Sequence, residues 1–360
     1  MNYYVNPNFT SVERVFPYQN RYGYIRLDMN ENPEGLPEEL VQKVLKRVNS
    51  TFLSTYPEPD VFLRKYANSI GIDEDNLMVT NGSDMGIRYI FETFGKPNSE
   101  VVTVSPSFEM YWVNCKLTGV KHIPVSYNND FSISVQNILE AINENTSIVV
   151  MLNPNNPIGN AYKKDEVISI IEKAKKCNSI VLIDEAYHYF YAETFLDLAL
   201  NYKNVIVLRT FSKIYSLAAC RLGVVISNNE IIRYLKQSKL SFEVNSFALL
   251  FGEAIVEEDG LLDYLIETAR EGKEYVLNAL CECGYECKTG LGNFIFVKPN
   301  MAPKEIEKKL REQKKILVHS FSHPLLKDYL RITTGSIRIM KIFVDALLDV
   351  DKKMNDSSLG

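Results

Sequence analysis

The chain has 360 residues, of which 46% are hydrophobic, and a formal net charge of −5. It is long enough for two domains, and it contains neither a basic block nor an apolar run near the roughly 20 residues that span a bilayer. We therefore expect no nucleic-acid or membrane partner, and the absence of a signal-peptide pattern at the N-terminus predicts a cytoplasmic protein.

The six cysteines do not predict a metal site. Three of them lie in the segment CECGYEC at 281–287, whose spacing matches no common zinc pattern and which has no histidine nearby in sequence. In a cytoplasmic chain of this size we expect all six to be reduced thiols.

The first half of the chain alternates between predicted helices and predicted strands. Helical spacing of apolar residues appears at 36–48 and at 163–178. Short apolar, β-branched runs predict strands at 77–80, 101–105, 147–152, 179–184, 205–211 and 223–227. Such strands, buried on both faces and separated by helices, are typical of a mainly parallel sheet covered by helices.

Polar, glycine-bearing or aromatic segments follow five of these strands. They are NGSD (81–84), PSFEMY (106–111), NPNNPIG (153–159), EAYHYF (185–190) and SK (212–213). Functional groups of a parallel sheet collect beyond the carboxyl ends of its strands, so these five segments predict a single site at one edge.

The pattern changes from about residue 230. Helical segments at 234–258 and 261–284 precede strand patterns at 293–298, 316–321 and 330–335, with further helices predicted at 302–314 and 336–354. We interpret this part as a smaller α+β domain made of residues 1–48 and 246–360, beside a large domain of residues 49–245.

Lys213 stands directly after a predicted core strand. Burying its charge there would be costly, so either its ammonium reaches solvent or its amine carries out covalent chemistry. The spacing of the segment does not choose between the two.

Nine motifs favour the covalent role. In chain order they are NENP, YPEP, TNGSD, PSFEMY, NPNNPIG, DEAY, TFSK, RLG and RITTGS. With them the chain resembles the fold-type I enzymes that use pyridoxal 5′-phosphate (PLP), the class I and II aminotransferases among them, and within these the histidinol-phosphate aminotransferase branch. The resemblance implies an α/β fold, with a mainly parallel seven-stranded sheet in the large domain and a smaller α+β domain.

The resemblance also implies roles around the PLP ring. Lys213 would bind the PLP aldehyde covalently and carry a proton to and from the substrate. Asp184 would pair with the pyridine nitrogen, although an aspartate there could instead cap a helix. Tyr187 and Asn156 would hydrogen-bond the ring 3′-oxygen, while Asn156 taken alone is equally a turn residue. Phe108 would stack on the ring, unless it is an ordinary core residue.

The phosphate of PLP would be held by backbone amides, hydroxyls and one guanidinium. The resemblance assigns these roles to Ser83, Asp84, Thr210, Ser212 and Arg221.

A tyrosine of the YPEP motif implies a homodimer, because Tyr56 matches the residue that reaches the partner subunit's cofactor phosphate. The alternative is a tyrosine in a turn set by proline. Arg331 would grip the substrate carboxylate, unless it forms a surface ion pair. Asn30 and Tyr18 match positions near the substrate.

His319 departs from the branch, which usually has an arginine there for the substrate phosphate. The charge of histidine depends on pH, so His319 would bind phosphate differently or have no substrate role.

These features predict a PLP-dependent aminotransferase. Its donor would be glutamate, and its acceptor a small phosphorylated ketone or aldehyde of the imidazole acetol phosphate or dihydroxyacetone phosphate type. One alternative is a PLP-dependent decarboxylase of serine or threonine phosphate. Another is a protein that binds PLP without turnover, against which the complete set of site residues argues.

Overall fold

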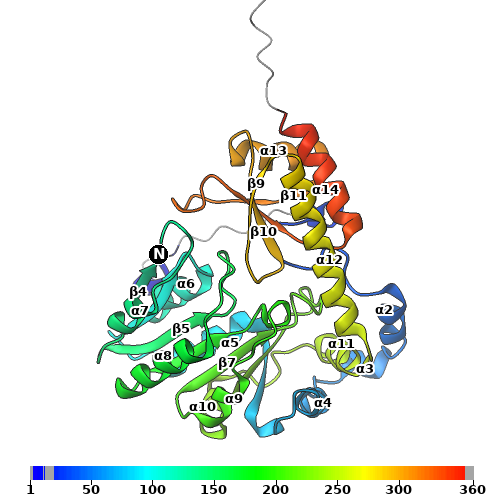
Figure 1. Ribbon diagram of the computed structural model, residues 1–360. Helices are drawn as coiled ribbons and strands as arrows, with labels where there is room; N and C mark the ends of the chain where they lie inside the picture. Colours follow the sequence, from blue (N-terminus) through cyan, green and yellow to red (C-terminus); the bar gives the residue numbers. More distant parts are fainter. Residues whose placement is uncertain (1–2, 11, 13–19, 353–360) are drawn as a thin grey trace, which may run out of the picture. The chain divides into compact units, whose positions relative to one another are not determined.

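The computed structural model describes residues 3–10, 12 and 20–352. The chain forms two compact units, and Figure 1 shows their helices and strands. The larger unit contains Leu36–Asp259 together with the described N-terminal residues 3–10 and 12. The smaller unit contains residues 20–35 and 260–352.

A seven-stranded sheet forms the centre of the larger unit. Its order is β2 (Leu77–Asn81), β8 (Leu222–Ser227), β7 (Val205–Thr210), β6 (Ile180–Asp184), β5 (Thr146–Leu152), β3 (Glu100–Ser105) and β4 (Lys121–Ser126). Strand β8 is antiparallel to both neighbours, and the other adjacent pairs are parallel. The predicted fold class, a mainly parallel seven-stranded sheet, is confirmed.

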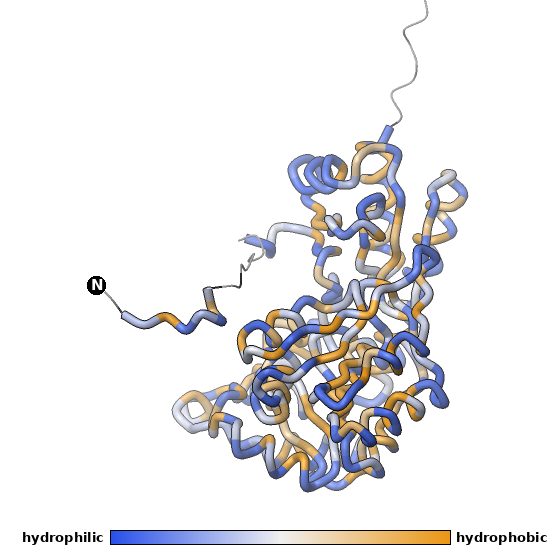
Figure 2. Tube along the Cα trace, turned by 90° about the vertical axis from the view of Figure 1, so that its left-hand side faces the viewer, coloured by the Kyte–Doolittle hydropathy of each residue, from blue (hydrophilic) through white to orange (hydrophobic). Residues whose placement is uncertain are grey.

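Every residue of β5, β7 and β8 is buried, which shows that both faces of the sheet are covered. Hydrophilic and hydrophobic residues alternate along the helical turns, as Figure 2 shows. The helices of this unit are α1 (Pro7–Thr10), α2 (Glu38–Leu45), α3 (Ser50–Ser54), α4 (Asp60–Ile70), α5 (Gly82–Phe94), α6 (Glu109–Thr118), α7 (Val135–Ala141), α8 (Lys164–Lys176), α9 (Leu196–Asn201), α10 (Asn229–Ser238) and α11 (Ser246–Glu257). No helix among the described residues is long and apolar enough to cross a membrane.

The smaller unit is built on an antiparallel sheet in the order β12 (His319–Ser320), β13 (Leu330–Thr333), β10 (Phe294–Lys298) and β9 (Glu286–Thr289). A short parallel pair joins β1 (Ile25–Arg26) to β11 (Ile316–Leu317). Helices α12 (Leu261–Glu282), α13 (Pro303–Lys314) and α14 (Ile337–Val350) complete the unit. Its apolar core includes Leu27, Ile295, Ile332 and Phe343.

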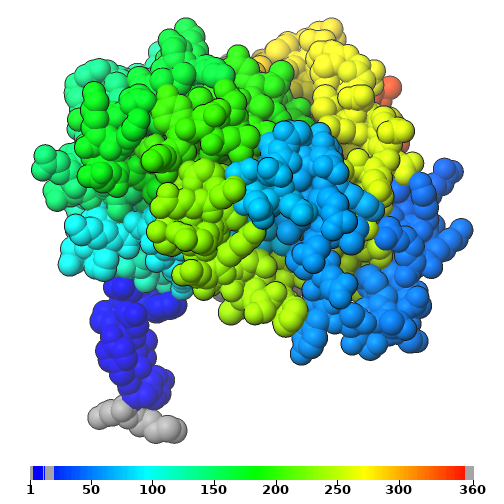
Figure 3. Space-filling view, turned by 90° about the horizontal axis from the view of Figure 1, so that it is seen from below, coloured from blue at the N-terminus to red at the C-terminus, as the bar shows by residue number. Residues whose placement is uncertain are grey.

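The units divide the chain differently from the expected domain boundaries. The sequence assigned residues 36–48 and 246–259 to the smaller domain, together with the described residues 3–10 and 12, but all of them belong to the larger unit. Helix α11 packs against α4 and α2 there, and Lys43 pairs with Glu258 at 2.8 Å. The surface of these blue and yellow-green segments is visible in Figure 3. The helix predicted at 234–258 is two helices, because Asn245 caps α11 by accepting a hydrogen bond from the Ala248 N–H at 2.8 Å.

Candidate active site

One edge of the large sheet carries most of the predicted cofactor residues. Strands β2, β3, β5, β6 and β7 run in the same direction, so their carboxyl ends share this edge, and antiparallel β8 begins there. The structure therefore brings the following residues to the same edge: Ser83, Asp84, Phe108, Asn156, Asp184, Tyr187, Thr210, Ser212, Lys213 and Arg221.

Asp184 ends β6 as a buried carboxylate that is 2% exposed. Its Oδ2 accepts a hydrogen bond from the Tyr111 hydroxyl at 2.8 Å, and its Oδ1 accepts one from the Ala186 N–H at 3.0 Å. Burial raises the pKa of Asp184 to about 7, although both hydrogen bonds act against that rise. Within the described part of the chain no basic side chain forms an ion pair with it, so a bound cation would complete the site.

Tyr111 was not singled out by the sequence. It lies one helical turn after Phe108, which immediately precedes α6, and the two rings meet edge to face with centroids 5.8 Å apart. Only its position inside PSFEMY could have marked it as a site residue, because its partner Asp184 is 73 residues away along the chain. Phe108 itself is half-buried at this edge.

The N-terminus of α5 lies beside Arg221, and together they could hold an anion. The first N–H groups of a helix have no partner within the helix, and here they include those of Ser83 and Asp84. Arg221 Nη2 lies 2.9 Å from Asp84 Oδ2, and its Nη1 donates to the Ser212 hydroxyl at 3.4 Å. Gly82 has a left-handed φ of 74°, which favours glycine, and a Cβ there would lie 2.5 Å from Arg221 Nη2.

Two further features lie at this helix terminus. A Cβ at Gly223 would lie 2.5 Å from the Ser83 backbone nitrogen, so β8 must carry glycine where the first turn of α5 lies against it. Thr210 Oγ1 accepts a hydrogen bond from the Ser212 N–H at 3.1 Å, and both residues are buried. The edge of the sheet therefore offers backbone amides, two hydroxyls and one guanidinium to an anion.

Lys213 lies in the loop after β7. Its Nζ is 5.9 Å from the centroid of the Tyr187 ring, and its carbonyl accepts a hydrogen bond from the Ser216 N–H at 3.1 Å. The rings of Phe211 and Tyr215, on either side of Lys213, stack with centroids 4.9 Å apart. The loop is therefore held by packing on both sides of the lysine.

A buried ion pair lies next to Asp184 and was also missed by the sequence. Arg209 and Glu185 are joined at 2.9 Å, with side chains 4% and 0% exposed. Glu185 additionally accepts hydrogen bonds from the Thr194 hydroxyl and the Phe195 N–H. This pair ties β7 to the loop that follows β6.

Asn155 links two loops of the site. It donates to the Pro106 carbonyl at 3.1 Å and accepts from the Ser107 hydroxyl at 2.8 Å. The loop that carries Phe108 is thereby fixed to the loop that carries the half-buried Asn156.

Tyr56 lies on the surface of the larger unit and is 73% exposed. Its ring stacks on that of Phe242, with centroids 4.5 Å apart and an interplanar angle of 25°. None of the described contacts joins Tyr56 to the site of its own chain.

The smaller unit contains three of the predicted substrate residues. Arg331 of β13 is 8% exposed and donates from Nη2 to the Asp28 carbonyl, and its guanidinium carbon lies 5.8 and 5.7 Å from the rings of Phe294 and Phe321. His319 of β12 is directly opposite Arg331 in the register. Asn30, with a left-handed φ of 58°, accepts at Oδ1 from the Thr333 hydroxyl at 3.1 Å. Tyr18 lies outside the described residues.

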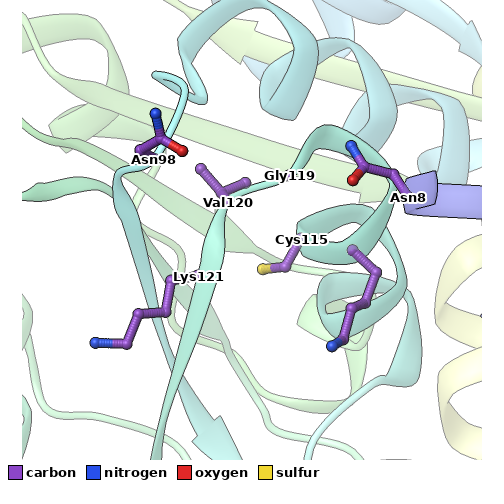
Figure 4. A pocket seen from close by; sticks show the side chains of 7 residues that line it. Asn8, Asn98, Cys115, Gly119, Val120 and Lys121 are labelled. Atoms are coloured by element: carbon purple, nitrogen blue, oxygen red, sulfur yellow. The ribbon is translucent and has the colours of Figure 1, made fainter. Parts of the chain in front are cut away.

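A separate hollow of about 390 Å³ lies at the turn between α6 and β4. Figure 4 shows the residues that line it, which are Asn8, Asn98, Cys115, Lys116, Gly119, Val120 and Lys121. It is at the amino end of β4, on the edge opposite the candidate site, because β4 runs parallel to β3. The described residues contain no cluster of three or more potential metal ligands.

The larger unit fits PLP on these observations. The buried carboxylate of Asp184, which forms no ion pair with a basic side chain of the described residues, suits a protonated ring nitrogen. The N-terminus of α5 with Arg221 suits a phosphate. Lys213 supplies an amine at the same edge, and Phe108 supplies an aromatic face.

Comparisons with known proteins agree with this fit. The family model described as aminotransferase class I and II matches residues 22–347. The chain is 38% identical over 319 residues to a histidinol-phosphate aminotransferase of Clostridium novyi (strain NT), covering 87% of each chain. It is 32% identical over 317 residues to one of Clostridium kluyveri, covering 87% of this chain and 89% of the relative.

A solved structure shares the fold. The histidinol-phosphate aminotransferase of Sinorhizobium meliloti, in complex with pyridoxal-5′-phosphate, superposes with a TM-score of 0.87 at 19% identity, covering 96% of this chain and 97% of the other. The predicted enzyme class and cofactor are confirmed by the family match, and the chain belongs to the PLP-dependent aminotransferases of class I and II.

Proposed function

We propose that this aminotransferase moves an amino group from glutamate to a small phosphorylated ketone or aldehyde, of the imidazole acetol phosphate or dihydroxyacetone phosphate type. Support for a phosphorylated substrate comes from the relatives at 38% and 32% identity, which are named for histidinol phosphate. The six cysteines are free thiols in the structure, which is compatible with the cytoplasmic location that forms part of this proposal.

The observation that carries the proposal is the buried Asp184 carboxylate at the same sheet edge as Lys213. Bound PLP supplies a carbonyl group for the substrate amine and an electron-withdrawing ring. Asp184 would hold the proton on the ring nitrogen by ion pairing, and the Tyr111 hydroxyl orients the carboxylate by donating to Oδ2 at 2.8 Å. Tyr187 and Asn156 would donate to the ring oxygen.

Lys213 would do the proton transfer. As an uncharged amine its Nζ can take a proton from the substrate Cα and later return it at another carbon, which arginine could not do because guanidinium stays protonated. Arg331 would bind the substrate carboxylate with its two-pronged guanidinium, and Asn30 would support that group.

His319 would contact the acceptor as a neutral group. Part of the residue is exposed, but burial of its ring and then the nearby Arg331 guanidinium lower its pKa to about 4. Its ring packs edge to face against Phe321, with centroids 4.6 Å apart. At neutral pH it would therefore offer a hydrogen bond to a phosphate and not a full positive charge.

We also propose a homodimer in which Tyr56 reaches the partner's cofactor. Large apolar side chains are exposed around it: Leu53 and Leu240 are each 66% exposed and Phe242 is 57% exposed. A monomer would leave this apolar surface in water, whereas a second copy of the chain would cover it.

The first experiment adds L-glutamate to the purified PLP-loaded protein and follows both the visible absorbance of the cofactor and the release of 2-oxoglutarate. Release with an absorbance change supports the glutamate donor, and phosphorylated ketones are then added to the aminated enzyme. Absence of 2-oxoglutarate would refute the donor assignment.

Two variants test the residue roles. Lys213→Ala should abolish turnover, whereas Lys203→Ala, which changes an exposed lysine of the same unit, should leave it unchanged. Tyr56→Phe should weaken PLP retention without changing the sedimentation coefficient of the dimer. Unchanged retention would count against the cross-subunit contact, and a monomeric wild type would refute it.

A further inference from the structure

Lys273 is a largely buried lysine in the middle of α12. Its Nζ donates hydrogen bonds to the carbonyls of Gly290 at 2.5 Å and Gly292 at 2.7 Å. Burial lowers its pKa to about 8, and among the described residues no carboxylate forms an ion pair with it. Because burying an ammonium group is costly, its role must lie in the two carbonyls that it holds.

Those carbonyls belong to the loop that connects β9 to β10 and ends at Asn293. Asn293 is 3% exposed and is fixed by two hydrogen bonds. Its carbonyl accepts from the Thr334 N–H at 2.8 Å, and its Nδ2 donates to the Asn30 carbonyl at 3.1 Å. The loop held by Lys273 is therefore joined to Asn30 and to the segment that follows Arg331.

Asn30 is in turn held against β13. Its N–H donates to the Thr333 hydroxyl at 2.9 Å, and Thr333 lies two residues after Arg331 on the same strand. Side chains two residues apart on a strand share a face of the sheet, so Asn30 is anchored on the face from which Arg331 projects.

The neighbouring residue, Gly272, fixes the other side of this region. A Cβ at position 272 would lie 1.7 Å from the Gly335 carbonyl oxygen, so the α12 backbone packs directly against the turn after β13. One turn of α12 thus supports both the 290–293 loop and the 334–336 turn.

We propose that Lys273 is a positioning residue for the substrate carboxylate: it fixes the 290–293 loop so that Asn293 holds Asn30 beside Arg331. The inference rests on the proposed function, which gives Asn30 and Arg331 their substrate roles. Small displacements of groups that orient a substrate reduce productive binding strongly, so the effect should appear in substrate affinity.

The test compares Lys273→Met with Lys273→Arg and with Lys304→Met, an exposed lysine of the same unit. With the PLP-loaded enzyme and L-glutamate, K273M should raise KM about tenfold while kcat stays within about twofold, the pattern of lost uniform binding. K273R keeps the charge and the donors, so it should recover most of the affinity, and K304M should match wild type. A KM unchanged in K273M would overturn the proposal.

A second variant tests the route through the loop. If Lys273 acts through Asn293, then the effects of Lys273→Met and Asn293→Ala on KM should not add in the double variant. Additive effects would overturn this route.

Hydrogen exchange separates this inference from the choice of donor. Peptides covering 27–33 and 330–336 should exchange faster in K273M than in K304M, whatever the substrate is. If exchange is faster in K273M but wild type does not turn over glutamate, the positioning role of Lys273 is supported and glutamate is rejected as the donor. Equal exchange in the two variants would reject the positioning role.

Discussion

Replacing Arg209 by methionine should destabilise the larger unit strongly. The Arg209 and Glu185 side chains are 4% and 0% exposed, and Arg209 also donates to the Thr194 hydroxyl at 2.8 Å. Without the guanidinium, the Glu185 carboxylate stays buried with hydrogen bonds from Thr194 and the Phe195 N–H only. A buried charge that loses its partner costs about 3–5 kcal/mol in the free energy of unfolding.

This free energy can be converted into a melting temperature. For units of this size, each kcal/mol corresponds to about 2–4 °C, so Arg209→Met should lower Tm by roughly 6–20 °C in a calorimetric scan. The matched control is Arg64→Met, because Arg64 pairs with Glu74 at 3.9 Å while their side chains are 64% and 52% exposed. An exposed pair of this kind contributes little, so the control should melt close to wild type.

The double variant decides the mechanism. Glu185→Gln added to Arg209→Met removes the uncompensated charge, and it should recover a substantial part of the lost Tm. If the double variant melts no higher than Arg209→Met, or if Arg209→Met melts within about 2 °C of wild type, the unpaired Glu185 carboxylate does not cause a loss of stability.

Three further predictions concern the cofactor site. Gly223→Ala would place a Cβ 2.5 Å from the Ser83 nitrogen, so equilibrium dialysis should show PLP affinity falling at least about tenfold; unchanged affinity would contradict the anion site. In the cofactor-free protein, burial raises the pKa of Asp184 from 3.8 to about 7, so the folded state binds this proton more tightly than the unfolded chain does. The contribution of Asp184 to stability therefore falls as the pH rises from about 4 to about 7. Cofactor-free Asp184→Asn, which cannot ionise, should therefore have a higher Tm than wild type at pH 8 and a similar Tm at pH 4. The same difference in Tm between variant and wild type at both pH values would contradict the raised pKa. Tyr111→Phe removes a donor to Asp184, so kcat should fall about tenfold, and an unchanged kcat would show that this hydrogen bond is dispensable.

The sequence predicted the centre of the large sheet well, because strands buried on both faces appear as continuous apolar runs. It missed three strands: the two-residue β1, and β4 and β9 at the edges of their sheets. Strand β4 reads KHIPVS, with a proline that an edge strand tolerates, and β9 reads ECKT, which has no apolar run. The predicted strand at 316–321 is interrupted at Val318, so it forms two short strands that pair with different partners.

The cofactor residues could be grouped from sequence because the carboxyl ends of parallel strands meet at one edge. Their supporting contacts could not, because a pair such as Tyr111 and Asp184 becomes visible only when distant segments are folded together. Arg209 and Asn293 carried no mark in the sequence either, since a charged residue within a strand pattern or an asparagine at a strand start is ordinary. The contacts that orient these groups are set by tertiary structure.

The reversed direction of β8 has a consequence for the cofactor. Because β8 returns antiparallel to β7, residues 211–221 leave the sheet edge and come back to the same edge. Lys213, the proposed covalent attachment point, and Arg221, a proposed ligand of the phosphate, therefore lie on one short loop of the chain, and PLP would contact both ends of that loop. The number of residues between them therefore limits how far apart these two side chains can lie, so we expect an insertion or a deletion in this loop to disturb PLP binding.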